Sequence, residues 1–276
     1  MIKLIVDTTC DIYPDEAEKL GIISIPMKVY FDDTEYIGGV NLSNEEFYKK
    51  LQSAKNLPTT TQINVFTYTE AIKPWLDKGD EVFVMCLSDK LSGSYNNLEQ
   101  AAKELNSPKL EILNTHTVSF GFHALVLEAI KLINQDCNLK QLKEEMSKLC
   151  DKMKLYTIIE NARYLIKGGR LSLGAGLLAK TLNIKPIVAV ENGGLKSVAK
   201  TMGYLNAKRA VKNFITDIDT TKSILVGYSN DKNRAEDFGK YIEKECGFKI
   251  TKYSEIGPII GTHAGPGCVG ITYFQK

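Results

Sequence analysis

The stretch EVFVMCLSDKLSGSYNNLEQAAKELN, residues 81–106, contains the pattern that decides the fold class. Its first part, EVFVMCL, is an almost continuous apolar run, which predicts a buried β-strand. The loop that follows is rich in serine and glycine, and a helical period begins near Ser94. Strand, loop and helix in this order are the repeating unit of an α/β protein.

The same alternation continues towards the N-terminus. Apolar runs at residues 2–6 and 22–31 predict further strands, and residues 44–52 follow a helical period. Ser43 and Glu46 have the spacing of a capping box at the start of that helix. We therefore expect an α/β protein whose N-terminal domain contains a largely parallel sheet.

A second unit begins after two helical patterns, at residues 118–133 and 139–153. From there the sequence predicts a strand at 155–160, a helix at 161–169 and a hairpin that turns at 192–194. We place the domain boundary just before this unit. The prediction is an N-terminal α/β domain at residues 1–153 and a smaller α/β domain at residues 154–276.

Composition and charge narrow the class of protein. The chain has 276 residues, 43% of them hydrophobic, and a net charge of +2, which gives no general electrostatic case for nucleic acid. No apolar run is long enough to span a bilayer, and the N-terminal apolar run is typical of a first strand rather than a signal peptide. We expect a cytoplasmic protein without stable membrane insertion.

The six cysteines form no C-x-x-C pair and no zinc-type spacing. This pattern predicts reduced thiols that serve in packing, and no metal site. Cys10 alone lies in a loop directly after a predicted strand, where thiolate chemistry is the alternative interpretation.

Loops that follow strands are the expected ligand sites, because ligands of α/β sheets bind outside the carboxyl ends of the strands. In DTTCD, residues 7–11, an aspartyl phosphatase would need an acid where Thr9 stands, so we interpret this loop as structural. The threonines of PTTTQ, residues 58–62, either cap a helix or donate to an anion. The serines and glycine of residues 92–94 have the geometry of an anion site, without the spacing of a nucleotide P-loop.

Two further residues stand out by their surroundings. Arg170 follows a glycine pair that caps a predicted helix, and it faces either a ligand or the other domain. His263 lies in GTHAGPGCVGI, residues 261–271, where glycines and a proline predict a tight, non-helical backbone. His263 is either a turn residue before the last strand or a hydrogen-bonding group for a ligand.

Six motifs in order, DTTCDI, PTTTQ, LSGSY, NARYLIKGGRLS, KPIVAVENGGLK and THAGPGCVGI, resemble the DegV family of bacterial fatty-acid-binding proteins over residues 2–274. The resemblance implies a two-domain carrier without cofactor or catalytic residues, which holds one long-chain fatty acid such as palmitate with its carboxylate near the domain junction. The ligand-binding residues that it implies are Thr60, Thr61, Ser92, Gly93, Arg170, His263 and Gly265.

The resemblance further implies a kinase partner. In family members with a defined partner, the carrier presents the carboxylate to a separate ATP-dependent fatty acid kinase. This chain departs from the family pattern at Asp89 and Lys90, which precede LSGSY, and after GGLK, where a family arginine has no clear equivalent.

Two other functions fit the same residues. The first is a Ser/His-type esterase that uses Ser92 and His263, with Asp7 or Asp11 as the orienting acid. The second is a regulatory protein that binds a small anion with the same loops, which predicts no long apolar tunnel.

Overall fold

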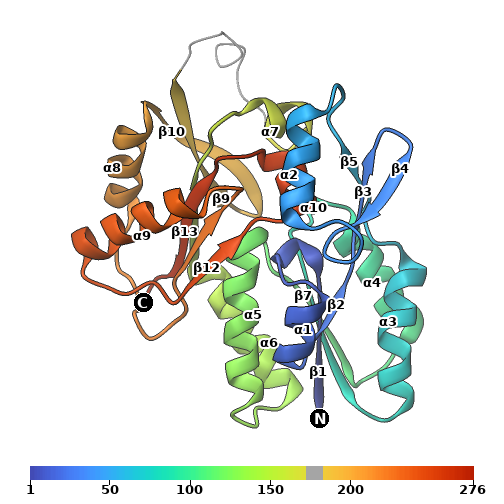
Figure 1. Cartoon of the computed structure of the whole chain (residues 1–276). Coiled ribbons are helices and arrows are strands. Elements are labelled where there is room, and N and C mark those ends of the chain that lie inside the picture. Colours follow the sequence, from blue (N-terminus) through green and yellow to red (C-terminus); the bar gives the residue numbers. More distant parts are fainter. Residues whose placement is uncertain (172–182) are drawn as a thin grey trace.

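The computed structural model describes residues 1–171 and 183–276, which form an α/β structure with three β-sheets (Figure 1). The first sheet is entirely parallel, with the strand order β2-β1-β6-β7. Its strands are β1 (Ile2–Asp7), β2 (Ile23–Ile25), β6 (Glu81–Cys86) and β7 (Leu110–Asn114). The largely parallel N-terminal sheet that the sequence predicts is thus confirmed.

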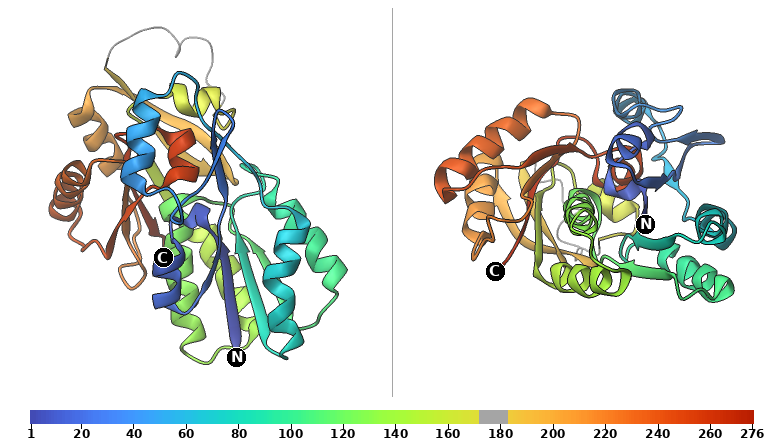
Figure 2. Two further views of the ribbon diagram at one scale, coloured as in Figure 1. Left: turned by 45° about the vertical axis from the view of Figure 1, so that its right-hand side comes forward. Right: turned by 90° about the horizontal axis from the view of Figure 1, so that it is seen from below.

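Helices cover both faces of this sheet (Figure 2). Helices α3 (Val65–Asp77) and α4 (Ser94–Leu105) lie on one face, and α5 (Ser119–Ile133) and α6 (Leu139–Lys152) lie on the other. The shorter η1 (Thr8–Cys10) and α1 (Pro14–Leu20) follow β1. The predicted start of α4 near Ser94 is confirmed.

A three-stranded sheet with the order β4-β3-β5 lies beyond the carboxyl end of the first sheet. Its strands are β3 (Lys28–Phe31), β4 (Thr34–Ile37) and β5 (Thr59–Thr60), and α2 (Asn44–Ser53) lies between β4 and β5 in the chain. Ser43 and Glu46 form the predicted capping box at the start of α2. The apolar run at residues 22–31 forms strands as expected, but it divides into β2 and β3 of two different sheets, because Pro26 lacks a backbone N–H and the chain changes sheets there.

The second half forms a six-stranded sheet with the order β10-β9-β8-β13-β11-β12, in which only β11 and β12 pair in parallel. The strands are β8 (Met153–Ile158), β9 (Ile184–Glu191), β10 (Gly194–Met202), β11 (Leu225–Tyr228), β12 (Lys252–Glu255) and β13 (Val269–Phe274). Helices α8 (Tyr204–Phe214) and α9 (Lys232–Cys246) cover its outer face, and α7 (Arg163–Lys167) and α10 (Pro258–Ala264) lie nearer the first half.

The predicted hairpin at residues 192–194 is confirmed as the connection between β9 and β10. Asn192 and Gly193 have φ values of 50° and 80°, as a type I′ turn requires. A Cβ on Gly193 would lie 2.6 Å from the Ser88 hydroxyl, so the tip of the hairpin rests on the loop after β6. The division into domains at residues 153 and 154 stays a prediction.

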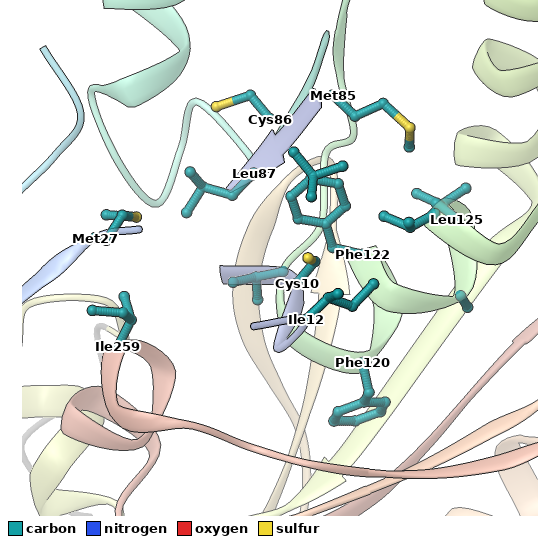
Figure 3. Close-up of a cluster of buried hydrophobic side chains, with 14 of the residues drawn as sticks. Cys10, Ile12, Met27, Met85, Cys86, Leu87, Phe120, Phe122, Leu125 and Ile259 are labelled. Carbon is teal, nitrogen blue, oxygen red and sulfur yellow. The ribbon is translucent and has the colours of Figure 1, made fainter. Parts of the chain in front are cut away.

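Helix α5 lies between the two large sheets and packs on both. An apolar helix buried on all sides is expected in such a place. Phe120 and Phe122, two residues apart, point in opposite directions (Figure 3): Phe122 lies with Met85 and Leu125 over the first sheet. Phe120 lies against β11, where a Cβ on Gly227 would come within 1.9 Å of its ring.

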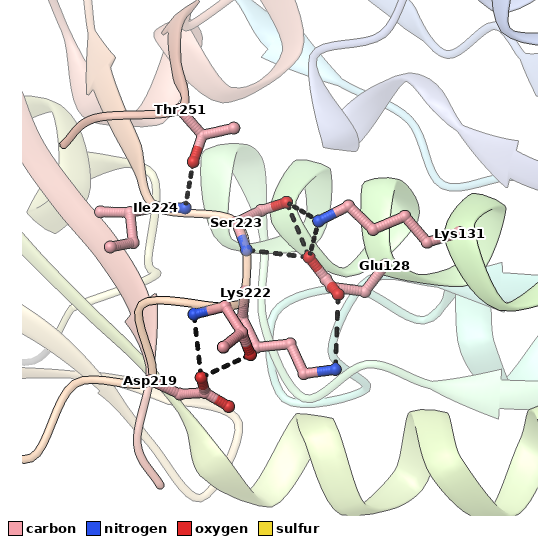
Figure 4. A network of polar contacts seen from close by, with 8 residues as sticks. Glu128, Lys131, Asp219, Lys222, Ser223, Ile224 and Thr251 are labelled. Carbon is pink, nitrogen blue, oxygen red and sulfur yellow. Dashed lines mark hydrogen bonds and ion pairs between the residues drawn. The ribbon is translucent and has the colours of Figure 1, made fainter.

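A buried carboxylate ties α5 to the loop before β11 (Figure 4). Glu128, whose side chain is 3% exposed, accepts hydrogen bonds from the backbone N–H and the hydroxyl of Ser223, at 2.8 and 2.7 Å. Lys131 and Lys222 lie 2.7 and 3.7 Å from its oxygens. The charge of Glu128 is therefore compensated by two cations and two hydrogen bonds.

Among the described residues, none of the helices has the length and apolar character needed to cross a bilayer. The same residues contain no cluster of three or more His, Cys, Asp or Glu suited to a metal ion.

Candidate functional site

A cavity of about 420 Å³ lies between the carboxyl end of the first sheet and the inner face of the second. Its walls are mostly apolar side chains from both halves, namely Met27, Leu87, Leu91, Val118, Phe120, Leu155, Ile159, Leu165, Val188, Leu195, Ile256, Ile259, Ile260 and Ala264. Met27 and Ile259 approach each other from opposite halves in Figure 3. A volume and lining of this kind are typical of a site for an apolar small molecule.

Polar side chains reach the same cavity from β5, the start of α4 and α10. Thr60, Thr61, Ser92, Arg170 and His263 all line it, as does Gly93. The structure therefore brings together all but one of the residues that the family resemblance implies for the site.

The remaining predicted residue, Gly265, lies outside the lining of the cavity. It ends α10 with a φ of 75°, and a Cβ there would lie 2.3 Å from the ring of Tyr164. Its missing side chain makes room for that ring rather than for a group in the cavity.

His263 lies in the last turn of α10, so the prediction of a non-helical backbone around it is wrong. Pro258 at the first helical position has no N–H to leave unpaired, and Gly261 packs within the helix against Tyr48 and Phe47. These two residues start and accommodate a helix rather than prevent one. The helix carries His263 to β5, where its Nε2 lies 3.0 Å from Oγ1 of Thr60.

Burial keeps the His263 imidazole neutral near pH 7. It lowers the pKa of His263 from 6.5 to about 4, and the positive charge of Arg170 acts in the same direction. Nδ1 is buried without a hydrogen-bond partner among the described residues and faces Gly168, where a Cβ would lie 2.5 Å away. A neutral ring carries one N–H, so Nε2 and Nδ1 cannot both donate.

Ser92 and Gly93 form the turn into α4. The Ser92 hydroxyl accepts from the backbone N–H of Ser94 at 3.2 Å and lies 3.0 Å from the Ser94 hydroxyl. Gln62 approaches Gly93 so closely that a Cβ there would lie 2.2 Å from its side-chain oxygen. Gln62 also lines the cavity and was missed as a site residue, although it belongs to the PTTTQ motif.

The threonines of PTTTQ do not cap α3, because Asn64 accepts from the N–H of Thr67 at 2.8 Å and fills that role. Thr59 and Thr60 instead form β5, and the N–H of Thr61 donates to the Lys28 carbonyl at 3.3 Å. Since the capping role is taken, the hydroxyls of Thr60 and Thr61 remain available to the cavity.

Arg170 joins the two halves of the protein. Its Nε donates to the Leu91 carbonyl at 3.4 Å in the loop after β6, and its terminal nitrogen donates to the Gly168 carbonyl. The position of the Arg170 side chain is therefore consistent with both interpretations drawn from the sequence, because it contacts the other half and also lines the cavity.

Hydrogen bonds in the DTTCD loop support its structural interpretation, and Thr9 of the same loop also lines the cavity. Asp7 accepts from the N–H of Thr9 at 2.9 Å, and Asp11 accepts from the N–H of Gly257 at 2.9 Å and from the Ser119 hydroxyl at 2.5 Å. Burial raises the pKa of Asp11 to about 7, against the two hydrogen bonds that lower it. Asp11, the C-cap residue of η1, is thereby connected to Gly257, the N-cap residue of α10.

Cys10, in the same loop, is buried, and burial raises the pKa of its thiol well above the usual range, with the charge of Asp7 adding to the effect. Both causes disfavour a reactive thiolate.

The pair needed by a Ser/His-type esterase is not formed between Ser92 and His263. Ser92 bonds to Ser94, His263 bonds to Thr60, and no carboxylate among the described residues accepts from Nδ1 of His263. Asp7 and Asp11 are engaged with backbone N–H groups elsewhere.

Comparison with known proteins places this architecture in one family. The model for a family described as "Uncharacterised protein, DegV family" matches residues 1–276. The chain belongs to the DegV family. A DegV domain-containing protein of Clostridium acetobutylicum is 30% identical to this member over 285 residues, which cover 100% of this chain and 99% of the relative. One from Caldanaerobacter subterraneus is 29% identical over 281 residues, with the same coverage.

Several solved structures share the whole fold of this chain. A DegV lipid binding protein from Thermotoga maritima has a TM-score of 0.85 and 26% identity, covering 99% of this chain and 98% of that one. A stearic acid-binding protein from Eubacterium ventriosum has a TM-score of 0.89 and 20% identity, covering 100% and 99%. A fatty acid-binding DegV family protein from Thermus thermophilus has a TM-score of 0.84 and 24% identity, with the same coverage.

Proposed function

We propose that this protein binds one long-chain fatty acid, such as palmitate, with the acyl chain in the apolar cavity and the carboxylate at Thr60, Thr61, Ser92 and His263. The observation that carries the proposal is the cavity itself, an apolar space whose hydroxyl and imidazole groups include the bonded pair Thr60 and His263. Lipid and fatty acid binding by relatives with the same fold supports it.

The acyl chain provides most of the affinity in this proposal. Burying roughly fifteen carbon groups at ~0.8 kcal/mol each gives a gross gain near ~12 kcal/mol. Each hydrogen bond to the charged carboxylate adds about 1.5 to 3 kcal/mol, and ordering the ligand offsets part of the total. The polar end therefore sets the orientation of the ligand more than its affinity.

At the polar end, His263 acts through Thr60. With the proton on Nε2, the imidazole donates to Oγ1 of Thr60, and the Thr60 hydroxyl turns its own proton towards the carboxylate. A neutral His263 suits this role, because it orients the hydroxyl without adding a charge. The Ser92 hydroxyl, on the loop opposite β5, supplies a second donor.

The protein acts as a carrier in this proposal and presents the carboxylate to a separate ATP-dependent fatty acid kinase. The kinase would transfer the γ-phosphoryl group of ATP to a carboxylate oxygen, leaving ADP. Neutral threonine and serine donors suit such a ligand, since a direct arginine clamp would withdraw electron density from the attacking oxygen.

Mass spectrometry of the purified protein tests the binding, natively and after solvent extraction. We expect one fatty acid per chain, or uptake of one when a series of chain lengths is offered. A protein that holds none and takes up none from the series would refute fatty acid binding.

Substitutions at the polar end test the site. Ser92→Ala and Thr60→Val should weaken palmitate binding, and Ser53→Ala, which removes an exposed hydroxyl on α2, should not. Equal retention of palmitate by all three variants would contradict the placement of the carboxylate. Kinase-dependent turnover of bound palmitate, measured with the same variants, tests the presentation step.

A further inference from the structure

A second hollow, of about 470 Å³, adjoins the apolar cavity at its polar side chains. Thr60, Arg170 and His263 line both spaces, so these three residues form the boundary between them. The other walls of the second hollow come from the loop before β5 and from α7 with the residues that follow it. The hollow therefore lies directly next to the proposed carboxylate site.

Every charged side chain among the described residues that line this hollow is a cation, namely Lys55, Arg163, Lys167 or Arg170. Within residues 1–171 and 183–276, none of these four cations lies within ion-pair distance of a carboxylate. Four unpaired cations around one concave surface repel each other, and an anion between them would remove that cost.

Two of the cations are held in place by neighbouring groups. Arg163 lies over the ring of Tyr164, 4.8 Å from its centre, and donates to the Tyr164 hydroxyl at 3.3 Å. Arg170 donates to the carbonyls of Leu91 and Gly168. A guanidinium has five N–H donors, so both arginines keep donors for a ligand.

We propose that this cationic hollow is a subsite for a phosphoryl group, held next to the carboxylate end of the acyl cavity by Lys55, Arg163, Lys167 and Arg170. A single carboxylate carries one negative charge and is served by the neutral donors Thr60 and Ser92. A phosphoryl group carries more charge and three acceptor oxygens, which match several lysine and arginine donors. The ligand class is an acyl phosphate, or a phosphate that binds beside the fatty acid.

The acyl part of this inference rests on the proposed fatty acid binding, whereas the charged hollow can be tested by itself. The double variant Lys55→Ala/Lys167→Ala removes two of the four cations and leaves Arg170, which also lines the acyl cavity, in place. The matched control, Lys140→Ala/Lys240→Ala, removes two exposed lysines from α6 and α9. Thermal unfolding checks that each variant folds.

Three probes separate the sources of the phosphoryl group: palmitate, a phosphonate analogue of palmitoyl phosphate in which a methylene replaces the bridging oxygen, and inorganic phosphate with palmitate-loaded protein. We expect the Lys55→Ala/Lys167→Ala variant to lose roughly 5- to 10-fold in affinity for the phosphonate and to bind palmitate like the wild type. The loss should shrink as salt is raised. If the variant instead loses affinity for inorganic phosphate and not for the phosphonate, the phosphate binds beside the fatty acid.

The outcomes distinguish the two proposals. If wild type and variant both bind palmitate and have equal affinity for each of the two phosphorus probes, the phosphoryl subsite is overturned and the proposed function is not. Palmitate that fails to bind the wild type overturns the proposed function, and the phosphorus-31 resonance of inorganic phosphate then still reports on the hollow. A variant that loses only its adsorption to vesicles of phosphatidylglycerol assigns the cations to a membrane surface and overturns the subsite.

Discussion

Oγ1 of Thr60 and Nε2 of His263 lie 3.0 Å apart, although 203 residues separate them in the chain. β5 carries the threonine, and α10 carries the histidine to it. The contact joins the two halves at the polar end of the cavity. It makes the orientation of one hydroxyl depend on a residue near the end of the sequence.

The first prediction concerns this pair and is a double-mutant cycle with Thr60→Val and His263→Ala. Each single variant should weaken palmitate binding by roughly 2- to 10-fold, the worth of one hydrogen bond. Because His263 acts through Thr60, its loss should have little further effect in the Thr60→Val background. Titration of palmitate by calorimetry measures this, and strictly additive losses would mean that His263 contacts the carboxylate independently.

The pH dependence of the same binding follows from the lowered pKa of His263, about 4. The imidazole is already neutral at pH 6 and stays neutral at higher pH. Palmitate affinity of the wild type and of His263→Ala should therefore differ by the same factor at pH 6, 7 and 8. A difference that grows between pH 6 and 7 would indicate a histidine that titrates near its ordinary value.

Asp11 gives a stability prediction of unusual sign. Its pKa is about 7 in the folded protein, against 3.8 ordinarily, so between these values the folded chain keeps a proton that the unfolded chain has released. Stability from this group is therefore highest at low pH and falls as the pH rises to 7. Since one pKa unit corresponds to ~1.4 kcal/mol, the loss should be roughly 2 to 4 kcal/mol.

Urea unfolding at pH 5 and pH 8 measures this effect, with Asp11→Asn as the test and the exposed Asp33→Asn as the control. The asparagine oxygen still accepts from Gly257, so the variant should lose less stability than the wild type between the two pH values. The buried histidines His123 and His263 have lowered pKa values and act in the opposite direction below pH 6.5, and the comparison of variants cancels them. Equal slopes for Asp11→Asn and wild type would rule out this account.

The next prediction concerns the polar contacts of Glu128, which connect α5 to the loop before β11. Glu128→Gln keeps an acceptor for Ser223 but leaves Lys131 and Lys222 without their buried counter-charge. Breaking a buried pair typically costs about 3 to 5 kcal/mol, and the partial exposure of both lysines reduces this to roughly 2 kcal/mol here. Unfolding of this variant and of Glu145→Gln, whose partner Lys148 is exposed, should show a clear loss only for the first.

The order of elements could be predicted from the sequence because periodicity and turn chemistry are local. The strand before residue 88, the start of α4 and the turn at Asn192 each follow from a few neighbouring residues. The apolar run around Pro26 gave no local sign that it divides into strands of two sheets. The prediction of a non-helical backbone failed at His263, where the glycine-rich segment forms a helix in which Gly261 packs against Tyr48.

The site was only partly predictable for a related reason. Thr60, Ser92 and His263 stand in motifs that can be recognised one at a time, whereas the cationic hollow has no motif. Nothing in the sequence distinguishes Lys55 and Lys167 from the other lysines, and both are exposed in the structure. The approach of the loop before β5 to α7 places them around one space. Charge clusters that arise from long-range contacts leave no local signal in the sequence.

The last prediction links packing to the length of the ligand. Gly227 on β11 supports the ring of Phe120, which also lines the cavity, so Gly227→Ala must push that ring aside. Overpacking of this kind costs about 1 to 3 kcal/mol, and a ring displaced towards the cavity shortens the space for the acyl chain. The variant should therefore be less stable and should prefer shorter fatty acids than the wild type.

Competition between fatty acids of different length, together with thermal unfolding, measures both effects. Gly194→Ala is the matched control, because the nearest atom to its Cβ would be a backbone oxygen at 3.7 Å, an ordinary contact. A destabilised Gly227→Ala with an unchanged chain-length preference would mean that Phe120 yields away from the cavity. In that case the end of the acyl chain must be sought at other lining residues, such as Leu155 and Val188 on β8 and β9.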